Sequence, residues 1–376
     1  MRTVRFGLIG CGRNASFHLS ASRNNLKVQF VAAYDPDGPN LKRFCQRNKL
    51  APHASLESLL MSNVDAVFIT VPHHLHAPLV VTAAEAGKHV ICEKPMANSL
   101  EDCDRMIVAV RRAGVKFMIT ENHRFLPAHK YIKEAVSRGL IGDVFLGRSY
   151  EGAFETPERI KNPDCWMFSW EKGGGGALHD QGAHKFAVWN WLLGEVEAAM
   201  CLCSKTLDSP SVKGEDTAMV MLKYKCGALV EVTVTTAAIH ASTNRIELHG
   251  TRGSIVEDHD WEKPVRIYSL HESAEHRGKV HCPEIEHGAF PMYYTISFRI
   301  EVDHFADCIL NNTTPEFTPE EAREAIAVSQ LAYFAAKRGC LTTMVEFREF
   351  IATEGTPALF EGIDKMPFAS YRNLHW

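Results

Sequence analysis

Short apolar runs alternate with amphipathic patterns along roughly the first 125 residues. Five runs rich in valine, isoleucine and phenylalanine end in polar or turn-forming residues and are predicted to be strands: residues 4–10, 28–35, 66–72, 89–95 and 116–122. Residues 74–87 and 99–114 carry apolar positions at helical spacing, and Ser99 with Asp102 resembles a capping box at the start of the second helix. Because strands apolar on both faces alternate with helices, the pattern predicts an α/β, doubly wound parallel sheet of the Rossmann type.

The alternation of strands and helices ends at about residue 126. We predict a helix over residues 131–142, a strand over 144–152 and a long hairpin over 217–238. A further strand–turn–strand over 245–258 and an amphipathic helix over 318–339 follow. Cys226 and Gly227 mark the hairpin turn, and Thr318 is the expected cap of the last helix. We therefore expect two domains, 1–125 and 126–376, the second an α+β domain with a large, mostly antiparallel open sheet. The tail from about Ile351 gives no clear pattern.

The composition is that of a soluble globular protein. Of 376 residues, 45% are hydrophobic and 23% charged, and this length suits two domains. The net charge of −4 gives no electrostatic reason to expect nucleic acid or an anionic membrane as a partner. The eleven cysteines show no CxxC pattern, which disfavours zinc ligation or a disulfide framework and favours a reducing compartment. With no signal-peptide pattern and no apolar run of membrane length, we expect a cytoplasmic protein.

A glycine motif follows the first predicted strand. The run Gly10-Cys11-Gly12-Arg13-Asn14-Ala15 fits G-x-G-x-x-A, in which glycines allow a tight turn and let a pyrophosphate approach a helix N-terminus. Asp35 ends the second predicted strand, where an acidic side chain accepts hydrogen bonds from ribose hydroxyls. No arginine follows Asp35 to bind a 2′-phosphate, so the sequence favours NAD over NADP.

Lys94 is the first candidate for chemistry. It lies in Glu93-Lys94-Pro95 at the carboxyl end of a predicted strand, where open α/β sheets bind their ligands. A lysine there can bind a hydroxyl oxygen and lower the pKa of the group being oxidised. A surface Glu–Lys pair before a helix is an equally good interpretation of these residues alone.

Four glycines, 173–176, precede a second candidate pair. If a helix begins after them, Asp180 and His184 stand at positions i and i+4 on one face. Histidine can act as a general base near neutral pH, and a carboxylate can orient it. An exposed helical Asp–His pair is the alternative interpretation. His73, His74 and His76 lack a carboxylate or cysteine at ligand spacing, so no metal site is predicted.

Taken together, these motifs resemble the Gfo/Idh/MocA oxidoreductase family over about residues 1–345. The resemblance rests on the nucleotide loop, Val71-Pro72 to His76, Glu93-Lys94-Pro95, Asn122-His123-Arg124-Phe125, Asp180 to His184, and His249 to Ser254. It implies an NAD(P)-dependent dehydrogenase acting on the CH–OH group of a sugar, glycoside or cyclic polyol such as inositol. It also implies a Rossmann domain for NAD, a second domain for substrate and oligomerisation, and a homodimer or homotetramer built on the exposed sheet face.

The resemblance assigns roles to individual residues. Lys94, Asp180 and His184 would be catalytic: His184 takes the proton as hydride leaves for the nicotinamide, Lys94 binds the reacting oxygen, and Asp180 orients the histidine or another hydroxyl. Arg124 and Trp166 would be further substrate contacts. The glycines would let a loop pass close to nicotinamide and sugar. The expected cofactor-binding residues are Gly10, Cys11, Gly12, Arg13, Asn14, Asp35, Val71, Pro72, His73, His76, Glu93, Lys94 and Asn122.

Two departures from the family pattern leave the substrate open. Ala187 stands where members acting on inositols often carry an acidic residue, and Val71 replaces a common threonine. A glycoside or another pyranose is therefore at least as well matched as inositol. Two other functions also fit the scaffold: a redox-neutral NAD-dependent glycosidase and a non-catalytic nucleotide-binding regulator.

Overall fold

The computed structural model describes residues 2–23, 25–162, 164–207, 212–239, 243–288, 292–362 and 369–370. The chain forms two compact units. The first consists of Met1–Phe125 and Tyr294–Arg323, and the second of Leu126–Tyr293 and Glu324–Trp376. The sequence pattern assigns all residues after 125 to one domain, whereas in the structure Tyr294–Arg323 belongs to the first unit.

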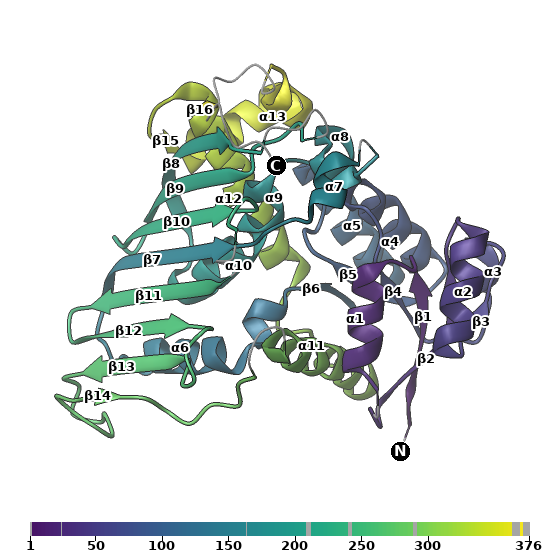
Figure 1. The fold of residues 1–376 in the computed structure, drawn as a ribbon, viewed down its shortest axis with the longest axis horizontal. Coiled ribbons are helices and arrows are strands. Elements are labelled where there is room, and N and C mark those ends of the chain that lie inside the picture. Colours follow the sequence, from purple (N-terminus) through teal and green to yellow (C-terminus); the bar gives the residue numbers. More distant parts are fainter. Residues whose placement is uncertain are drawn as a thin grey trace. The chain divides into compact units, whose positions relative to one another are not determined.

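The first unit contains a six-stranded parallel sheet, as predicted (Figure 1). Its order is β3-β2-β1-β4-β5-β6, which is the order of a Rossmann fold. The strands are β1 (Val4–Ile9), β2 (Val28–Tyr34), β3 (Ala51–Pro52), β4 (Ala66–Ile69), β5 (His89–Glu93) and β6 (Phe117–Thr120). The very short β3 was not predicted, because two residues give no periodic signal.

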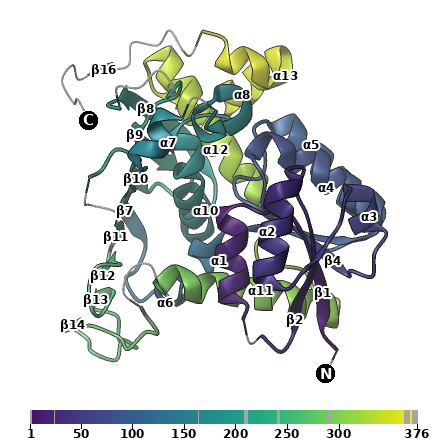
Figure 2. The same ribbon diagram turned by 45° about the vertical axis from the view of Figure 1, so that its right-hand side comes forward.

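Helices cover this sheet and close its core. They are α1 (Arg13–Ala21), α2 (Gly38–Asn48), α3 (Leu56–Leu60), α4 (His76–Glu85), α5 (Leu100–Ala113) and α11 (Met292–Asn311), with 3-10 turns η1 (His73–Leu75) and η2 (Asn122–Phe125). Helices α4 and α5 lie side by side (Figure 2). The Ser99 side chain caps α5 by accepting from the Asp102 N–H, as predicted. Phe305 of α11 is buried among the sheet residues Phe6 and Phe68.

The second unit is built on a ten-stranded, mostly antiparallel sheet, which confirms the predicted α+β architecture (Figure 1). Its order is β14-β13-β12-β11-β7-β10-β9-β8-β15, with β16 beside β8. Strand β7 pairs in parallel with β10, and β16 with β8; the other described pairs are antiparallel. The strands are β7 (Val144–Gly152), β8 (Val196–Lys205), β9 (Thr217–Tyr224), β10 (Leu229–Thr235), β11 (Asn244–Gly250), β12 (Gly253–Asp258), β13 (Val265–Ser269), β14 (Val280–His281), β15 (Thr342–Thr343) and β16 (Ala369–Ser370).

The helices of this unit include α6 (Pro127–Ser137), α7 (Pro157–Lys161), α8 (Trp170–Gly173), α9 (Ala177–Asp180), α10 (Gly182–Leu193), most of α12 (Pro319–Arg338), α13 (Met344–Phe360) and the turn η3 (Trp166–Phe168). Helix α6 starts and ends earlier than the predicted 131–142, because Pro127 occupies its first turn and Gly139 follows it with a positive φ of 68°. Helix α10 packs on β7: the Trp189 Nε1–H donates to Ser149 Oγ at 2.9 Å, and a side chain at Gly147 would collide with the Trp189 ring.

Candidate active site

The two glycines of the nucleotide loop have different surroundings. Gly10 has a φ of 96°, and a Cβ there would lie 2.5 Å from the Thr70 carbonyl oxygen, so only glycine fits the turn. At Gly12, by contrast, a Cβ would meet no atom of the described residues within 4 Å, apart from the immediate chain. Arg13 and Asn14 are exposed in the first turn of α1 beyond it. The turn is therefore fixed by packing, while the space before the helix N-terminus stays open.

Asp35 lies beside this loop. One carboxylate oxygen accepts from the Cys11 backbone N–H at 2.8 Å, and the other accepts from the Asp37 N–H at 2.9 Å. Asn40 Nδ2 donates to the Cys11 carbonyl at 3.2 Å, which ties the start of α2 to the same loop. The structure thus brings together the glycine motif and the acidic residue that the sequence pairs at a distance.

His76 connects the ends of β4 and β5. Its ring is fully buried, with Nδ1 2.9 Å from the Pro95 carbonyl oxygen and Nε2 3.0 Å from the Val71 carbonyl oxygen. Burial lowers the pKa of His76, which favours the neutral ring with a single N–H. His76 therefore lies between the two loops and can donate to one of their carbonyl groups. One of these loops carries the half-buried Lys94, and the role of His76 at the cofactor stays a prediction. His73 is buried next to it, with ring centroids 5.6 Å apart.

Glu93 belongs to a buried charged cluster that the sequence did not indicate. Its Oε1 lies 2.6 Å from His18 Nε2, and Nδ1 of the same ring lies 3.8 Å from Glu301 Oε1. Burial acts to raise the pKa of Glu93, but the His18 contact outweighs it and the pKa is lowered. Burial and the neighbouring carboxylates raise the pKa of Glu301 well above normal, so this group holds a proton. Glu93 thus anchors the loop before Lys94 from inside the unit.

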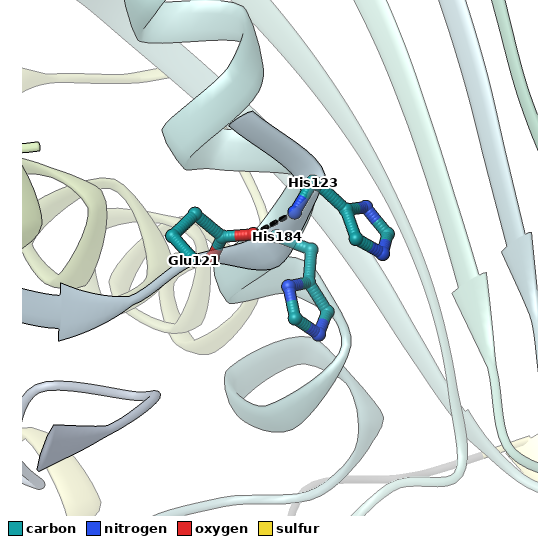
Figure 3. Close-up of side chains that lie close together, drawn as sticks. All are labelled: Glu121, His123 and His184. Carbon is teal, nitrogen blue, oxygen red and sulfur yellow. Dashed lines mark hydrogen bonds between the residues drawn. The ribbon is translucent and has the colours of Figure 1, made fainter. Parts of the chain in front are cut away.

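The predicted Asn122–Phe125 motif forms η2 at the end of β6. Asn122 Nδ2 donates to Ser297 Oγ at 3.1 Å. The buried guanidinium of Arg124 pairs with Glu321 at 2.9 Å and lies 4.7 Å from the Phe317 ring centroid. Arg124 is therefore engaged with residues of the first unit, and its predicted substrate contact stays a prediction. Figure 3 shows the adjoining bond, in which the His123 N–H donates to Glu121 Oε1 at 3.3 Å.

The glycine run in the second unit fits against two buried side chains. A Cβ at Gly175 would collide with the Tyr333 hydroxyl, and one at Gly176 with the Glu215 backbone and carboxyl group. Gly174 and Gly175 also have positive φ values of 79° and 157°. The expected reason for the glycines was the approach of sugar and nicotinamide. In the structure, the close packing of Tyr333 and Glu215 against Gly175 and Gly176 also requires glycine at these two positions.

Glu215 and Tyr333 hold the start of α9. Glu215 Oε1 accepts from the Leu178 N–H and from the Tyr333 hydroxyl, both at 2.8 Å. The same hydroxyl accepts from the Gly176 N–H at 3.1 Å. Residues 118 positions apart thereby fix the segment that leads to Asp180. Sequence reasoning missed both, because neither belongs to a local motif.

Glu215 should make the stability of the protein depend on pH. Burial raises its pKa from 4.5 to about 7, so between these values the folded state holds a proton that the unfolded state has released. The stabilisation of the folded state by protonated Glu215 is complete below pH 4.5 and is lost as pH rises through 7. We expect the unfolding free energy of the wild type, relative to Glu215→Gln, to fall by about 2–3 kcal/mol between pH 5 and 8. Urea unfolding of both proteins at each pH measures this; parallel curves would contradict it.

Asp180 and His184 lie on two short helices instead of the single helix expected. Asp180 ends α9, Gln181 forms the junction, and the buried His184 lies in the first turn of α10 (Figure 3). The next residue, Lys185, is almost fully buried, lies 3.5 Å from the Glu151 carboxylate and donates to Asn244 Oδ1. This buried pair fixes α10 to β7 and β11, and with it the backbone of His184.

Trp166 lies in η3 of the second unit. The residue is half-buried, and its carbonyl group lies close to Gly173. Of the predicted catalytic and substrate residues, Trp166, Asp180 and His184 therefore belong to one unit, with Lys94 and Arg124 in the other.

Comparisons with known proteins match both units. A family model described as oxidoreductase family, NAD-binding Rossmann fold, matches residues 4–121, and the GFO/IDH/MocA C-terminal domain matches residues 129–256. The chain is 30% identical to a myo-inositol 2-dehydrogenase of Thermotoga maritima over 70% of this chain and 77% of that protein. It is 31% identical to a levoglucosan dehydrogenase of Pseudarthrobacter phenanthrenivorans over 57% of this chain and 61% of that protein. It is 29% identical to a 2,7-anhydro-N-acetylneuraminate hydratase of Escherichia coli over 67% of this chain and 67% of that protein.

A solved structure has the same fold. A levoglucosan dehydrogenase in complex with NADH superimposes with a TM-score of 0.82 over 91% of this chain and 99% of that chain, at 23% identity. In the part of the chain that the structure describes, no helix combines the length and apolar character needed to cross a membrane.

Proposed function

Because the chain belongs to the GFO/IDH/MocA family of NAD-binding oxidoreductases, we propose that it oxidises a secondary hydroxyl of a sugar, glycoside or cyclic polyol to a ketone, with NAD as the hydride acceptor. The names of two similar proteins, an inositol dehydrogenase and a levoglucosan dehydrogenase, support this substrate class. Inositols and anhydrosugars both present secondary hydroxyls on a six-membered ring, which is the chemical feature the substrate is proposed to share.

The nucleotide loop is the observation that carries the cofactor assignment. Protein atoms crowd Gly10 but leave the space at Gly12 open, as a pyrophosphate at the N-terminus of α1 requires. The proposed pyrophosphate contacts run from Gly10 to Asn14, and Asp35 is proposed to bind the ribose hydroxyls. An acidic side chain there also repels a 2′-phosphate, which supports NAD over NADP. Bound NAD supplies the carbon that accepts the hydride.

Four side chains are proposed to act on or contact the substrate. His184 accepts the proton of the reacting hydroxyl as a general base. Lys94 donates a hydrogen bond to the same oxygen and stabilises the negative charge that develops there. Asp180 orients His184 or binds a second hydroxyl, and Trp166 provides an apolar surface for the ring. The anchored backbones of α10 and of the loop before Lys94 support these roles, because a fixed geometry lowers the entropy cost of reaction.

A substrate panel tests the proposal. The purified protein is mixed with NAD or NADP and with inositols, aldoses or glycosides, and the absorbance of reduced nicotinamide is followed. We expect a signal with at least one substrate that is stronger with NAD and is lost in His184→Ala. A preference for NADP would contradict the role of Asp35, and a signal retained in His184→Ala would contradict the proposed base.

A redox-neutral reaction is the second candidate, because a hydratase is among the similar proteins. In this case the cofactor would oxidise a sugar transiently and reduce it again, and no reduced nicotinamide would accumulate. Chromatography of the sugar products then separates the possibilities: a cleaved or hydrated product without net reduction of NAD favours this reaction. Bound NAD with no change in any sugar would favour a nucleotide-binding regulator.

Gly12→Asp should weaken NAD binding without unfolding the protein. Aspartate is a good N-cap residue, and the space around Gly12 accommodates a side chain, so we expect the unfolding free energy to stay within about 0.5 kcal/mol. The added carboxylate would face the pyrophosphate and raise the Kd for NAD by about tenfold or more. Titration calorimetry with NAD measures this. Gly10→Ala is the contrasting variant, expected to lose stability first; an unchanged Kd in Gly12→Asp would refute the assignment.

We also propose that the chain forms a homodimer or homotetramer through the outer face of the second unit's sheet. Leu202 pairs with Met219, and the half-buried Met200 with Met221, so that the exposed apolar side chains of Leu202, Met219 and Met221 stand together on β8 and β9. Met221→Lys should therefore lower the mass measured by light scattering toward that of a monomer. Val345→Lys, which changes an exposed apolar residue on α13, is the control and should not. A monomeric wild type would contradict the proposal.

A further inference from the structure

Two histidines and a glutamate converge on the buried face of the second unit's sheet, and none of them takes part in the proposed reaction. His129 lies on α6, Glu257 on β12, and His259 directly after that strand. They are 2%, 0% and 2% exposed. We propose that these three side chains bind a divalent transition-metal ion, with zinc as the expected occupant.

Close nitrogen–oxygen contacts join the three side chains of this cluster. Glu257 Oε1 lies 2.6 Å from His259 Nε2, and Oε2 lies 3.6 Å from His129 Nε2. Among the described residues, however, neither oxygen of Glu257 has a partner in hydrogen-bond geometry. Buried carboxylate oxygens almost always have such partners, so two that lack them call for an explanation. An ion seated between the carboxylate and the imidazoles provides one.

A carboxylate as deeply buried as Glu257 requires a compensating cation. Its ion-pair partners within the described part of the chain are these two imidazoles. The nearby Lys185 ammonium group pairs with Glu151 at 3.5 Å. The cation near Glu257 is therefore either a proton on an imidazole or a metal ion.

The donor set and its dimensions suit zinc. Imidazole nitrogen and carboxylate oxygen bind Zn²⁺ at about 2.0–2.2 Å, so two tetrahedral ligand atoms stand about 3.3 Å apart. The separation between His129 and Glu257 is 3.6 Å, close to this value. The 2.6 Å contact between His259 and Glu257 would have to open by about 0.7 Å, a small side-chain rotation. A water molecule would complete four-coordination.

A second group of similar residues provides a matched control. Glu275, His276 and His281 also lie within reach of one another near β14, but Glu275 and His276 are exposed. Solvent already satisfies the charges there, so this group has no need of an ion.

Metal analysis of the untagged full-length protein tests the proposal. The protein is stripped with a chelator, incubated with Zn²⁺ and desalted, and its zinc is measured by mass spectrometry; Co²⁺ absorption reports the ligand geometry. We expect one ion per chain in the wild type and in His276→Gln, and background levels in His129→Gln and Glu257→Gln. Zn²⁺ at about 100 times its Kd should raise the Tm of the wild type by about 3–4 °C.

Circular dichroism of each variant, recorded without metal, shows whether the variant is folded, so that a loss of zinc can be distinguished from a loss of structure. If Glu257→Gln does not fold, His129→Gln, which leaves the carboxylate in place, provides the comparison. A folded wild type that takes up neither Zn²⁺ nor Co²⁺ would overturn the proposal and leave a proton as the occupant. Equal uptake by His129→Gln and His276→Gln would overturn it as well, because the ion would then lie elsewhere.

Discussion

Replacing His184 with alanine should lower kcat by about two to four orders of magnitude while the Kd for NAD stays nearly unchanged. The reason is that His184 is proposed to accept the substrate proton, whereas the proposed nucleotide contacts lie in the loop after β1 and at Asp35. The side chain is 8% exposed and lies on a helix anchored by Lys185, so alanine removes the imidazole without releasing the backbone. Steady-state rates and NAD titrations on the same preparations measure both quantities.

An exposed histidine serves as the control for this variant. His276→Ala should keep the wild-type kcat and the wild-type affinity for NAD. If His184→Ala instead lost NAD affinity in proportion to its rate, the residue would be a cofactor contact. If the rate fell less than tenfold, another group would have to accept the proton.

Gly176→Ala should have the second large effect, a loss of about 3 kcal/mol of unfolding free energy. The new methyl group would overlap the backbone carbonyl of Glu215 and approach its carboxyl group, and backbone cannot rotate away as a flexible side chain can. The shift would also disturb the Tyr333 hydroxyl, which binds the Gly176 N–H. Urea unfolding monitored by tryptophan fluorescence provides the measurement.

Gly12→Ala is the matched substitution. At that position a Cβ meets no described atom within 4 Å apart from the immediate chain, φ is −86° and no proline follows, so we expect the unfolding free energy to change by less than about 1 kcal/mol. A loss below 1 kcal/mol in Gly176→Ala would show that the glycines are not required by Glu215 and Tyr333. The approach of a ligand would then be the better explanation for the run.

The sequence predicted the elements whose signals are local. A short apolar run predicts strand β1, and the G-x-G-x-x-A pattern with the later acidic residue predicts the glycine turn and the place of Asp35. Ser99 marks the start of α5 because serine is a preferred N-cap residue. Helix α11 escaped prediction because its sequence is rich in aromatic and β-branched residues, which are poor helix formers; burial of Val302 and Phe305 in the core overrides this preference.

The site was predictable to the same extent. Lys94 and His184 stand in motifs, whereas Glu215 with Tyr333 and His18 with Glu301 meet only through the tertiary fold. The fit of the glycine run against Glu215 and Tyr333 is such a contact and was therefore missed. Arg124 shows the converse: its motif was visible, but its pairing with Glu321 could not be inferred from neighbouring residues.

The return of α11 to the first unit has a consequence for how the protein is made. Phe305 and Val302 complete the core around Phe6 and Phe68, but the ribosome synthesises them only after the entire second sheet as far as β14. The first unit therefore cannot close its core while it emerges, although its six strands come first. A fragment ending at residue 125 would expose this apolar surface and aggregate, and the two units cannot be separated by a single cut.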